Sequence, residues 1–222
     1  MTKKTATIIG ATGLIGSYLY NLILKDDEYS EIRIISRRPL ENDHPKVKVV
    51  VIDFADNEAY KSAIKGSDVV FCAIGTTSKK VKGDKTEYRK VDYDVPVNAA
   101  KFCKETGCEK FIFVSSVGAS SKSKNFYLKQ KGEVEDAVKS LSIKSAVALR
   151  PSLLLGDRKE FRFGEDVGKY IIIPLSILFP TNMKPIKALM VAKAMLQASK
   201  EYLMGYNVMH RTEMKKLSAS IK

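Results

Sequence analysis

Short apolar runs alternate along the first 150 residues with segments whose apolar residues recur every three or four positions. Such runs are typical of strands buried on both faces, and the second pattern is typical of amphipathic helices. Strands are expected at residues 5–9, 31–36, 47–53, 68–74, 110–115 and 144–150, and helices at residues 57–65, 85–105 and 125–140, after a first helix ending near residue 25. Pro96 predicts a kink or break in the long helix. The alternation predicts an α/β fold: a Rossmann-type, doubly wound parallel sheet with helices on both faces.

Three glycines, Gly10, Gly13 and Gly16, follow the first predicted strand and lead into the first helix. Gly10 permits a tight turn, and Gly13 lets a pyrophosphate approach the backbone closely. Gly16 lets the helix pack closely on the strand. The helix N-terminus would add free N–H groups and the positive end of its dipole. The spacing G-x-x-G-x-x-G is one residue longer than the dinucleotide fingerprint G-x-G-x-x-G. We predict a nucleotide cofactor here, in preference to a glycine-rich turn without a ligand. The expected contacts in this turn are Gly10, Thr12, Gly13, Leu14, Ile15 and Gly16.

The end of the second strand indicates which dinucleotide binds. Proteins that bind NAD typically carry an acid there for the ribose hydroxyl, whereas NADP-binding proteins supply arginine. This chain has Ser36, Arg37 and Arg38 and no acid, so NADP (NADPH) is favoured over NAD; the alternative is that the arginines only decorate a turn. Further cofactor contacts are expected from Asp53 and Phe54 beside the adenine, and from Ala73, Ile74 and Gly75 at the end of the fourth strand.

Beyond Arg150 glycines and prolines interrupt the pattern, and one more helix is expected at residues 186–199. We expect a single domain over residues 1–222, with a dinucleotide-binding core at residues 1–150 and a small substrate cap at residues 151–222. Apolar stretches at residues 161–170 and 174–180 suggest a lid over the nicotinamide end that admits a small apolar carbonyl or quinone compound. A packing or dimer surface explains them equally well.

Tyr127 and Lys131 lie four residues apart and therefore share one face of the helix predicted at residues 125–140. A neighbouring cation stabilises a phenolate, and a tyrosine so tuned can give or take a proton as hydride moves to or from a carbonyl carbon. Ser116, at the end of the preceding strand, could donate a hydrogen bond to the same carbonyl oxygen. Chance alone gives one or two such tyrosine–base pairs in this chain, and Tyr29 with Arg33 is a second. The position of the first pair in the predicted fold is what distinguishes it.

The net charge of +13 is compatible with nucleic acid, an anionic membrane surface or a phosphorylated ligand as partner. The basic residues are scattered among acids, and no nucleic-acid-binding motif is found, so a lysine-rich solvated surface is favoured. The longest apolar stretch, residues 170–179, is too short to span a bilayer. Three cysteines without metal-ligand spacing, and an N-terminus unlike a signal peptide, favour a cytoplasmic protein without a metal.

Taken together, these motifs resemble the short-chain dehydrogenase/reductase superfamily over nearly the whole chain, and most of all its atypical branch that includes the Tat-interacting-protein oxidoreductases. The resemblance rests on residues 10–16 (GATGLIG), 71–77 (FCAIGTT), 91–94 (VDYD), 115–119 (SSVGA), 125–128 (NFYL), 131–135 (KGEVE) and 149–151 (LRP). It implies that Ser116 orients the substrate carbonyl, Tyr127 is the general acid/base, and Lys131 binds the nicotinamide ribose and tunes the tyrosine. Asp92 departs from the pattern, because many extended members carry asparagine there.

The resemblance implies a reaction type without a substrate. We expect NADPH-dependent reduction of a small carbonyl or quinone compound by a monomer or homodimer, with no specific nucleic-acid partner. The alternative is a non-catalytic, NADPH-binding redox sensor.

Overall fold

A computed structural model describes residues 3–76, 81–156 and 180–221. Its centre is a seven-stranded sheet in the order β3-β2-β1-β4-β5-β6-β9, and every neighbouring pair is parallel. The strands are β1 (Lys4–Ile9), β2 (Tyr29–Ser36), β3 (Val47–Val51), β4 (Val69–Cys72), β5 (Lys110–Val114), β6 (Ser145–Leu149) and β9 (Gly205–Met209). The Rossmann-type α/β sheet expected from the sequence is confirmed.

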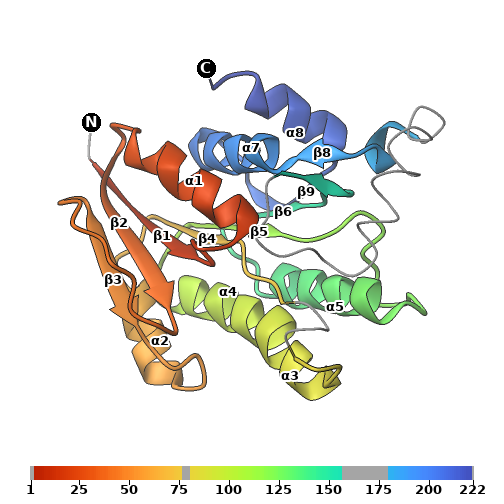
Figure 1. Ribbon diagram of the computed structural model, residues 1–222, viewed down its shortest axis with the longest axis horizontal. Coiled ribbons are helices and arrows are strands. Elements are labelled where there is room, and N and C mark those ends of the chain that lie inside the picture. The colour runs from red at the N-terminus through yellow and green to blue at the C-terminus, as the bar shows by residue number, and fades with distance from the viewer. Residues whose placement is uncertain (1–2, 77–80, 157–179, 222) are drawn as a thin grey trace.

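Helices cover both faces of this sheet (Figure 1). One face carries α1 (Leu14–Leu24), α7 (Ala188–Lys200) and α8 (Arg211–Ser218), and the other carries α2 (Asn57–Ile64), α4 (Val95–Glu105) and α5 (Phe126–Ser140). Successive side chains of a strand point to opposite faces, so one strand serves both cores. Ile112 of β5 packs with α1 and α7, whereas Phe111 and Phe113 pack with α4 and α5. This two-sided burial explains why the strands read as continuous apolar runs.

The long helix expected at residues 85–105 changes its hydrogen-bonding pattern along its length. It is divided into α3 (Lys85–Arg89), a π-helical turn η1 (Lys90–Asp94) and α4, and Pro96 lies in the first turn of α4. Proline suits that position because the first N–H groups of a helix have no intrahelical partner. Residues 85–105 stay helical, so the irregularity found near Pro96 is the π turn just before it and not a break, and this turn places Asp92 in the protein interior.

The described part of residues 151–222 contributes to the sheet itself. β9 extends the sheet beyond β6, α7 packs on α1, and α8 packs on α7. Neither β9 nor α8 was expected from the sequence, nor was the small pair of strands β7 (Leu154–Leu155) and β8 (Ile186–Lys187), near the short 3-10 helix η3 (Thr181–Met183). The suggested lid at residues 161–170 and 174–180 lies, except for Pro180, outside the described residues. Within the described ranges, no helix is both long and apolar enough to cross a membrane.

Candidate dinucleotide and catalytic site

The turn between β1 and α1 contains glycines of two kinds. Gly10 has a φ of +87°, and a Cβ atom there would lie 2.8 Å from the carbonyl carbon of Ala73. A Cβ atom on Gly16 would lie 2.0 Å from the carbonyl oxygen of Gly10. Both glycines are therefore required by the packing of the chain itself. Gly13 differs, because among the described residues its Cβ would meet Gly10 O at 3.3 Å and Ala73 O at 3.7 Å. A side chain at Gly13 would need a shift of a few tenths of an ångström, far less than at Gly10 or Gly16, and the exposed backbone there fits a ligand that approaches it closely.

The N-terminus of α1 suits an anion. Gly13 is its N-cap in an extended conformation, no side chain caps the helix, and its first turn holds no acid. The positive end of the helix dipole and the first N–H groups therefore have no acidic or capping side chain of this helix beside them, next to exposed Thr12 and half-buried Leu14. Ile15 is buried in the core, so only its backbone can contribute to such a site.

The position of this turn in the sheet matches that of a dinucleotide site. The chain leaves β1 towards β2 and β3 on one side and then crosses to β4 on the other. Ligands of open α/β sheets bind outside the carboxyl ends of the strands where the order reverses in this way. Ala73, Ile74 and Gly75 follow β4 at that reversal, and Ala73 N–H donates to Ile9 O at 2.9 Å. The predicted phosphate turn and the predicted β4 contacts thus lie next to each other.

The carboxyl ends of β2 and β3 carry the residues expected near the adenosine. Ser36 ends β2 and its Oγ accepts a 3.3 Å hydrogen bond from the N–H of Arg38. Arg37 and Arg38 are exposed, and neither guanidinium forms an ion pair or hydrogen bond with another described residue. Beyond β3, the carboxylate of Asp53 accepts from the N–H of the residue two positions on at 3.0 Å, and Phe54 packs edge-on against Tyr60. The two arginines can therefore turn towards a phosphate without breaking an ion pair or guanidinium hydrogen bond to a described residue.

Helix α5 presents the predicted catalytic side chains. Its N-cap Asn125 accepts a hydrogen bond from the N–H of Leu128, which fixes where the helix begins. A Cβ atom on Gly132 would lie 2.1 Å from the backbone of Ser120, so the helix rests directly on the segment that follows β5. The Lys131 ammonium lies 6.0 Å from the centre of the Tyr127 ring. The structure thus brings the predicted pair together on one helical face.

Lys131 is almost fully buried and faces Asp92. Its Nζ lies 3.2 Å from Asp92 Oδ1, and the exposed fractions of the two side chains are 7% and 1%. The other carboxylate oxygen of Asp92 accepts a 2.6 Å hydrogen bond from the N–H of Thr76. Asp92, left without a role in the sequence analysis, is therefore the direct partner of the predicted catalytic lysine.

The two serines after β5 differ in their surroundings. Ser115 is buried and donates a hydrogen bond to Glu135, which also accepts two bonds from Arg150 at 2.9 and 2.6 Å and one from the Tyr206 hydroxyl at 3.1 Å. Ser116 is half-buried, and with the described residues its hydroxyl makes only a long 3.4 Å bond to the Val117 carbonyl. Of the two, Ser116 retains the freer hydroxyl, although no hydrogen bond joins it to Tyr127 among the described residues.

Sequence reasoning missed the Glu135 cluster, although one signal was present. Glu135 follows Lys131 by four residues, so that Tyr127, Lys131 and Glu135 occupy successive turns of one face of α5. Arg150 was noted only as part of a motif. Tyr206 lies on β9, the strand that the hydrophobic pattern did not reveal.

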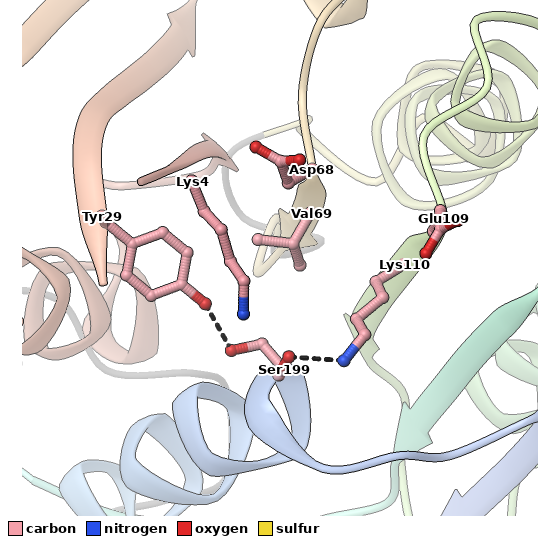
Figure 2. Close-up of a pocket in the computed structure, with 7 residues that line it drawn as sticks. All are labelled: Lys4, Tyr29, Asp68, Val69, Glu109, Lys110 and Ser199. Atoms are coloured by element: carbon pink, nitrogen blue, oxygen red, sulfur yellow. Dashed lines mark hydrogen bonds between the residues drawn. The ribbon is translucent and has the colours of Figure 1, made fainter. Parts of the chain in front are cut away.

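A small cavity of about 110 Å³ lies at the opposite, amino-terminal edge of the sheet. Figure 2 shows the side chains that line it, from Lys4, Tyr29, Asp68, Val69, Glu109, Lys110 and Ser199. The Tyr29 hydroxyl and Ser199 Oγ are 2.6 Å apart, and Lys110 Nζ donates to the carbonyl of Ser199 at 2.6 Å. This cavity is formed by residues that hold the amino ends of the strands to the end of α7. It is separate from the predicted cofactor site. Among the described residues, no group of three or more metal-binding side chains is found.

Comparisons with known proteins identify the class. A family model described as NAD(P)H-binding matches residues 10–169, and the chain belongs to this family. It is 38% identical over 168 residues to Protein HTATIP2 of Rattus norvegicus, covering 74% of this chain and 69% of that protein. It is 36% identical over 157 residues to Protein FMP52, mitochondrial, of Debaryomyces hansenii, covering 70% and 69%. These relatives confirm the resemblance to the atypical short-chain dehydrogenase/reductases.

Solved structures support the fold. A UDP-N-acetylglucosamine 4-epimerase from Methanobrevibacter ruminantium superposes with a TM-score of 0.70 at 20% identity, covering 97% of this chain and 81% of that one. WbmH of Bordetella bronchiseptica, solved in complex with NAD+, has a TM-score of 0.70 at 17% identity, covering 95% and 76%. At this level of identity the likeness concerns the fold alone. The protein is thus an NAD(P)-binding, Rossmann-fold member of the atypical short-chain dehydrogenase/reductase group.

Proposed function

We propose that this protein is an NADPH-dependent oxidoreductase that reduces a small carbonyl or quinone compound. The observation that carries the proposal is the pairing of Tyr127 with buried Lys131 on α5, at the same sheet edge as the glycine turn. A redox sensor needs only the turn, whereas a buried ammonium beside a tyrosine is costly to build and suits proton transfer.

The preference for NADPH rests on the end of β2. Arg37 and Arg38 are exposed and have no acidic partner among the described residues, and a guanidinium matches the geometry of a phosphate. An adenosine ribose at the neighbouring carboxyl ends of β2 and β3 would place its 2′-phosphate within their reach. Asp53 is engaged with its own turn, and Phe54 offers a ring beside the adenine.

In the proposed reaction, bound NADPH supplies a hydride to the carbonyl carbon of the substrate. Tyr127 donates a proton to the carbonyl oxygen, and Ser116 donates a hydrogen bond that orients this oxygen. Lys131 binds the nicotinamide ribose and stabilises the phenolate that remains on Tyr127 after the proton has left. The hydroxyl of Ser115 is held by Glu135, which fixes the backbone that carries Ser116.

Gly13→Val tests the cofactor assignment. The new side chain would cover the surface that a pyrophosphate must approach, while its Cβ, 3.3 Å from Gly10 O and 3.7 Å from Ala73 O, requires only a small local shift. We expect NADPH affinity to fall at least about a hundredfold, with a smaller loss in Gly13→Ala, because several charge-assisted hydrogen bonds are lost. Calorimetric titration measures this, and circular dichroism verifies folding. Unchanged affinity in folded Gly13→Val would remove the assignment.

A screen of carbonyl and quinone compounds with NADPH oxidation as readout tests the reaction itself. Turnover of one class supports the oxidoreductase. Micromolar NADPH binding without turnover of any compound would favour the sensor instead. We propose a cytoplasmic location and a monomer or homodimer; the fungal relatives are named as mitochondrial, so fractionation of cells is the direct test.

A further inference from the structure

The Asp92 carboxylate joins two parts of the proposed site that are distant in sequence. Its Oδ1 pairs with Lys131 of α5, and its Oδ2 accepts the backbone N–H of Thr76, just beyond the β4 residues expected to contact the cofactor. Asp92 itself lies in the π turn η1, where an extra residue per turn can point a side chain inward. One buried carboxylate therefore fixes both the helix that carries the catalytic pair and the loop on which the nicotinamide half would lie.

The charged and titratable groups around Lys131 indicate a second role for Asp92. A buried ammonium is unstable unless an anion compensates it, and it otherwise gives up its proton. Lys131 is faced by Cys72 from β4, Tyr127 from its own helix and Asp92 from η1. Burial raises the pKa of the Cys72 thiol to about 12, so this group is neutral.

The other buried carboxylate near Lys131 is engaged elsewhere. Glu135, one turn further along α5, is held by Arg150, Ser115 and Tyr206. Asp92, paired directly with the ammonium, is therefore a group that compensates the charge of Lys131 within the described site.

Building on the function proposed above, we propose that Asp92 is a positioning residue that keeps Lys131 charged and aligned with the end of β4. It acts through Lys131 and Thr76 and does not itself touch the reacting atoms. An asparagine at this position would still accept the Thr76 N–H but could not compensate the ammonium. The aspartate thus extends the pH range over which Lys131 holds the cofactor.

The pH dependence of NADPH affinity tests this in the full-length protein. We compare the wild type with Asp92→Asn, Lys131→Met and the control Glu133→Gln, from about pH 6 to about pH 9. Glu133 lies on α5 and pairs at 2.7 Å with Arg89 at the surface, so its substitution removes the same charge away from Lys131. The NADPH affinity of each variant is expressed relative to that of the wild type at the same pH. This ratio cancels the effect of titrating the cofactor phosphate.

The proposal makes a specific expectation for each variant. Asp92→Asn should bind NADPH like the wild type near pH 6 and lose affinity progressively, until near pH 9 it matches Lys131→Met, about tenfold weaker. Lys131→Met should be weakened equally at every pH, and Glu133→Gln should follow the wild type. If Asp92→Asn follows the wild type throughout, or is weakened equally at every pH, the proposal is wrong.

Two further results distinguish a failure of this proposal from a misfolded variant and from a failure of the proposed function. Asp92→Glu retains the charge but displaces it, so it should weaken binding without new pH dependence; it provides the test if Asp92→Asn does not fold. A pH dependence in Asp92→Glu like that expected for Asp92→Asn would overturn the proposal. Wild-type affinity in folded Lys131→Met would instead contradict the proposed role of Lys131, and with it the proposed mechanism.

Discussion

At the amino edge of the sheet, Lys110 donates to the carbonyls of Ser199 and Glu201 at the end of α7, and the Tyr29 hydroxyl bonds to Ser199 (Figure 2). At the carboxyl edge, α1 begins without a side-chain cap, and Arg37 and Arg38 have no acidic partner among the described residues. The same parallel sheet thus ends in two ways. The Lys110 ammonium at the amino edge satisfies the chain's own helix terminus, while the uncapped start of α1 and the exposed arginines at the carboxyl edge have no such partner among the described residues. Polar groups that the chain pairs with itself contribute to stability, and those that it leaves available indicate a ligand.

The largest effect that this comparison predicts is on the rate of reaction. Tyr127→Phe retains the ring and removes the hydroxyl, so turnover should fall by about 10²–10⁴ because the general acid/base is lost. The matched control is Tyr29→Phe, the same substitution at the opposite edge, which should leave turnover unchanged. Tyr29 also has a basic residue four positions on, Arg33, but both lie on strand β2. The Arg33 guanidinium donates hydrogen bonds to Glu31 and to two backbone carbonyls. Steady-state NADPH oxidation with a substrate found by screening measures both, and native turnover in Tyr127→Phe would contradict the mechanism.

The next effect concerns the choice of cofactor. Arg37→Ala/Arg38→Ala should weaken NADPH by about ten- to a hundredfold, since a hydrogen bond to a charged group contributes about 1.5–3 kcal/mol. NADH, which lacks the 2′-phosphate, should bind nearly as before and is the internal control. Parallel calorimetric titrations with both dinucleotides give the answer. Equal weakening of both would mean that the arginines serve the turn and do not select the cofactor.

The smallest effect is expected at the amino edge and concerns stability alone. Tyr29→Phe removes the 2.6 Å bond to Ser199, whose hydroxyl keeps its own bond to the Leu196 carbonyl, so no polar group is orphaned. The free energy of unfolding should fall by about 0.5–1.5 kcal/mol, with NADPH affinity unchanged. Urea denaturation at neutral pH measures the free energy of unfolding.

The same variant has a consequence at high pH. Burial raises the pKa of the Tyr29 phenol well above its ordinary value of about 10. The folded protein therefore keeps a proton that the unfolded chain loses, and stability falls as pH rises above about 10. Tyr29→Phe should make this fall shallower. If the free energy of unfolding falls equally steeply with pH in the wild type and in Tyr29→Phe, then Tyr29 does not contribute to this fall.

How far the sequence predicts this molecule depends on how local each feature is. The Gly10–Gly16 turn and an irregularity near Pro96 follow from the conformational limits of single residues, so both could be predicted. β9 could not, because this edge strand is only half-buried and carries Asn207 among its apolar positions. The partners of Lys131 and Ser115 depend on packing between α5 and distant segments. The sequence therefore suggested Tyr127 and Lys131 but not Asp92 or Glu135.

The pairing of β6 with β9 has a consequence for biosynthesis. β9 begins at Gly205, whereas β6 ends at Leu149, so a ribosome must add all the intervening residues before the last strand can join the sheet. Parallel pairing over such a separation is intrinsically slow. The Tyr206 hydroxyl on β9 completes the hydrogen bonds of Glu135, which holds Ser115 beside the proposed catalytic serine. A nascent chain should therefore form its cofactor turn early and acquire an ordered catalytic centre only after this last strand has emerged.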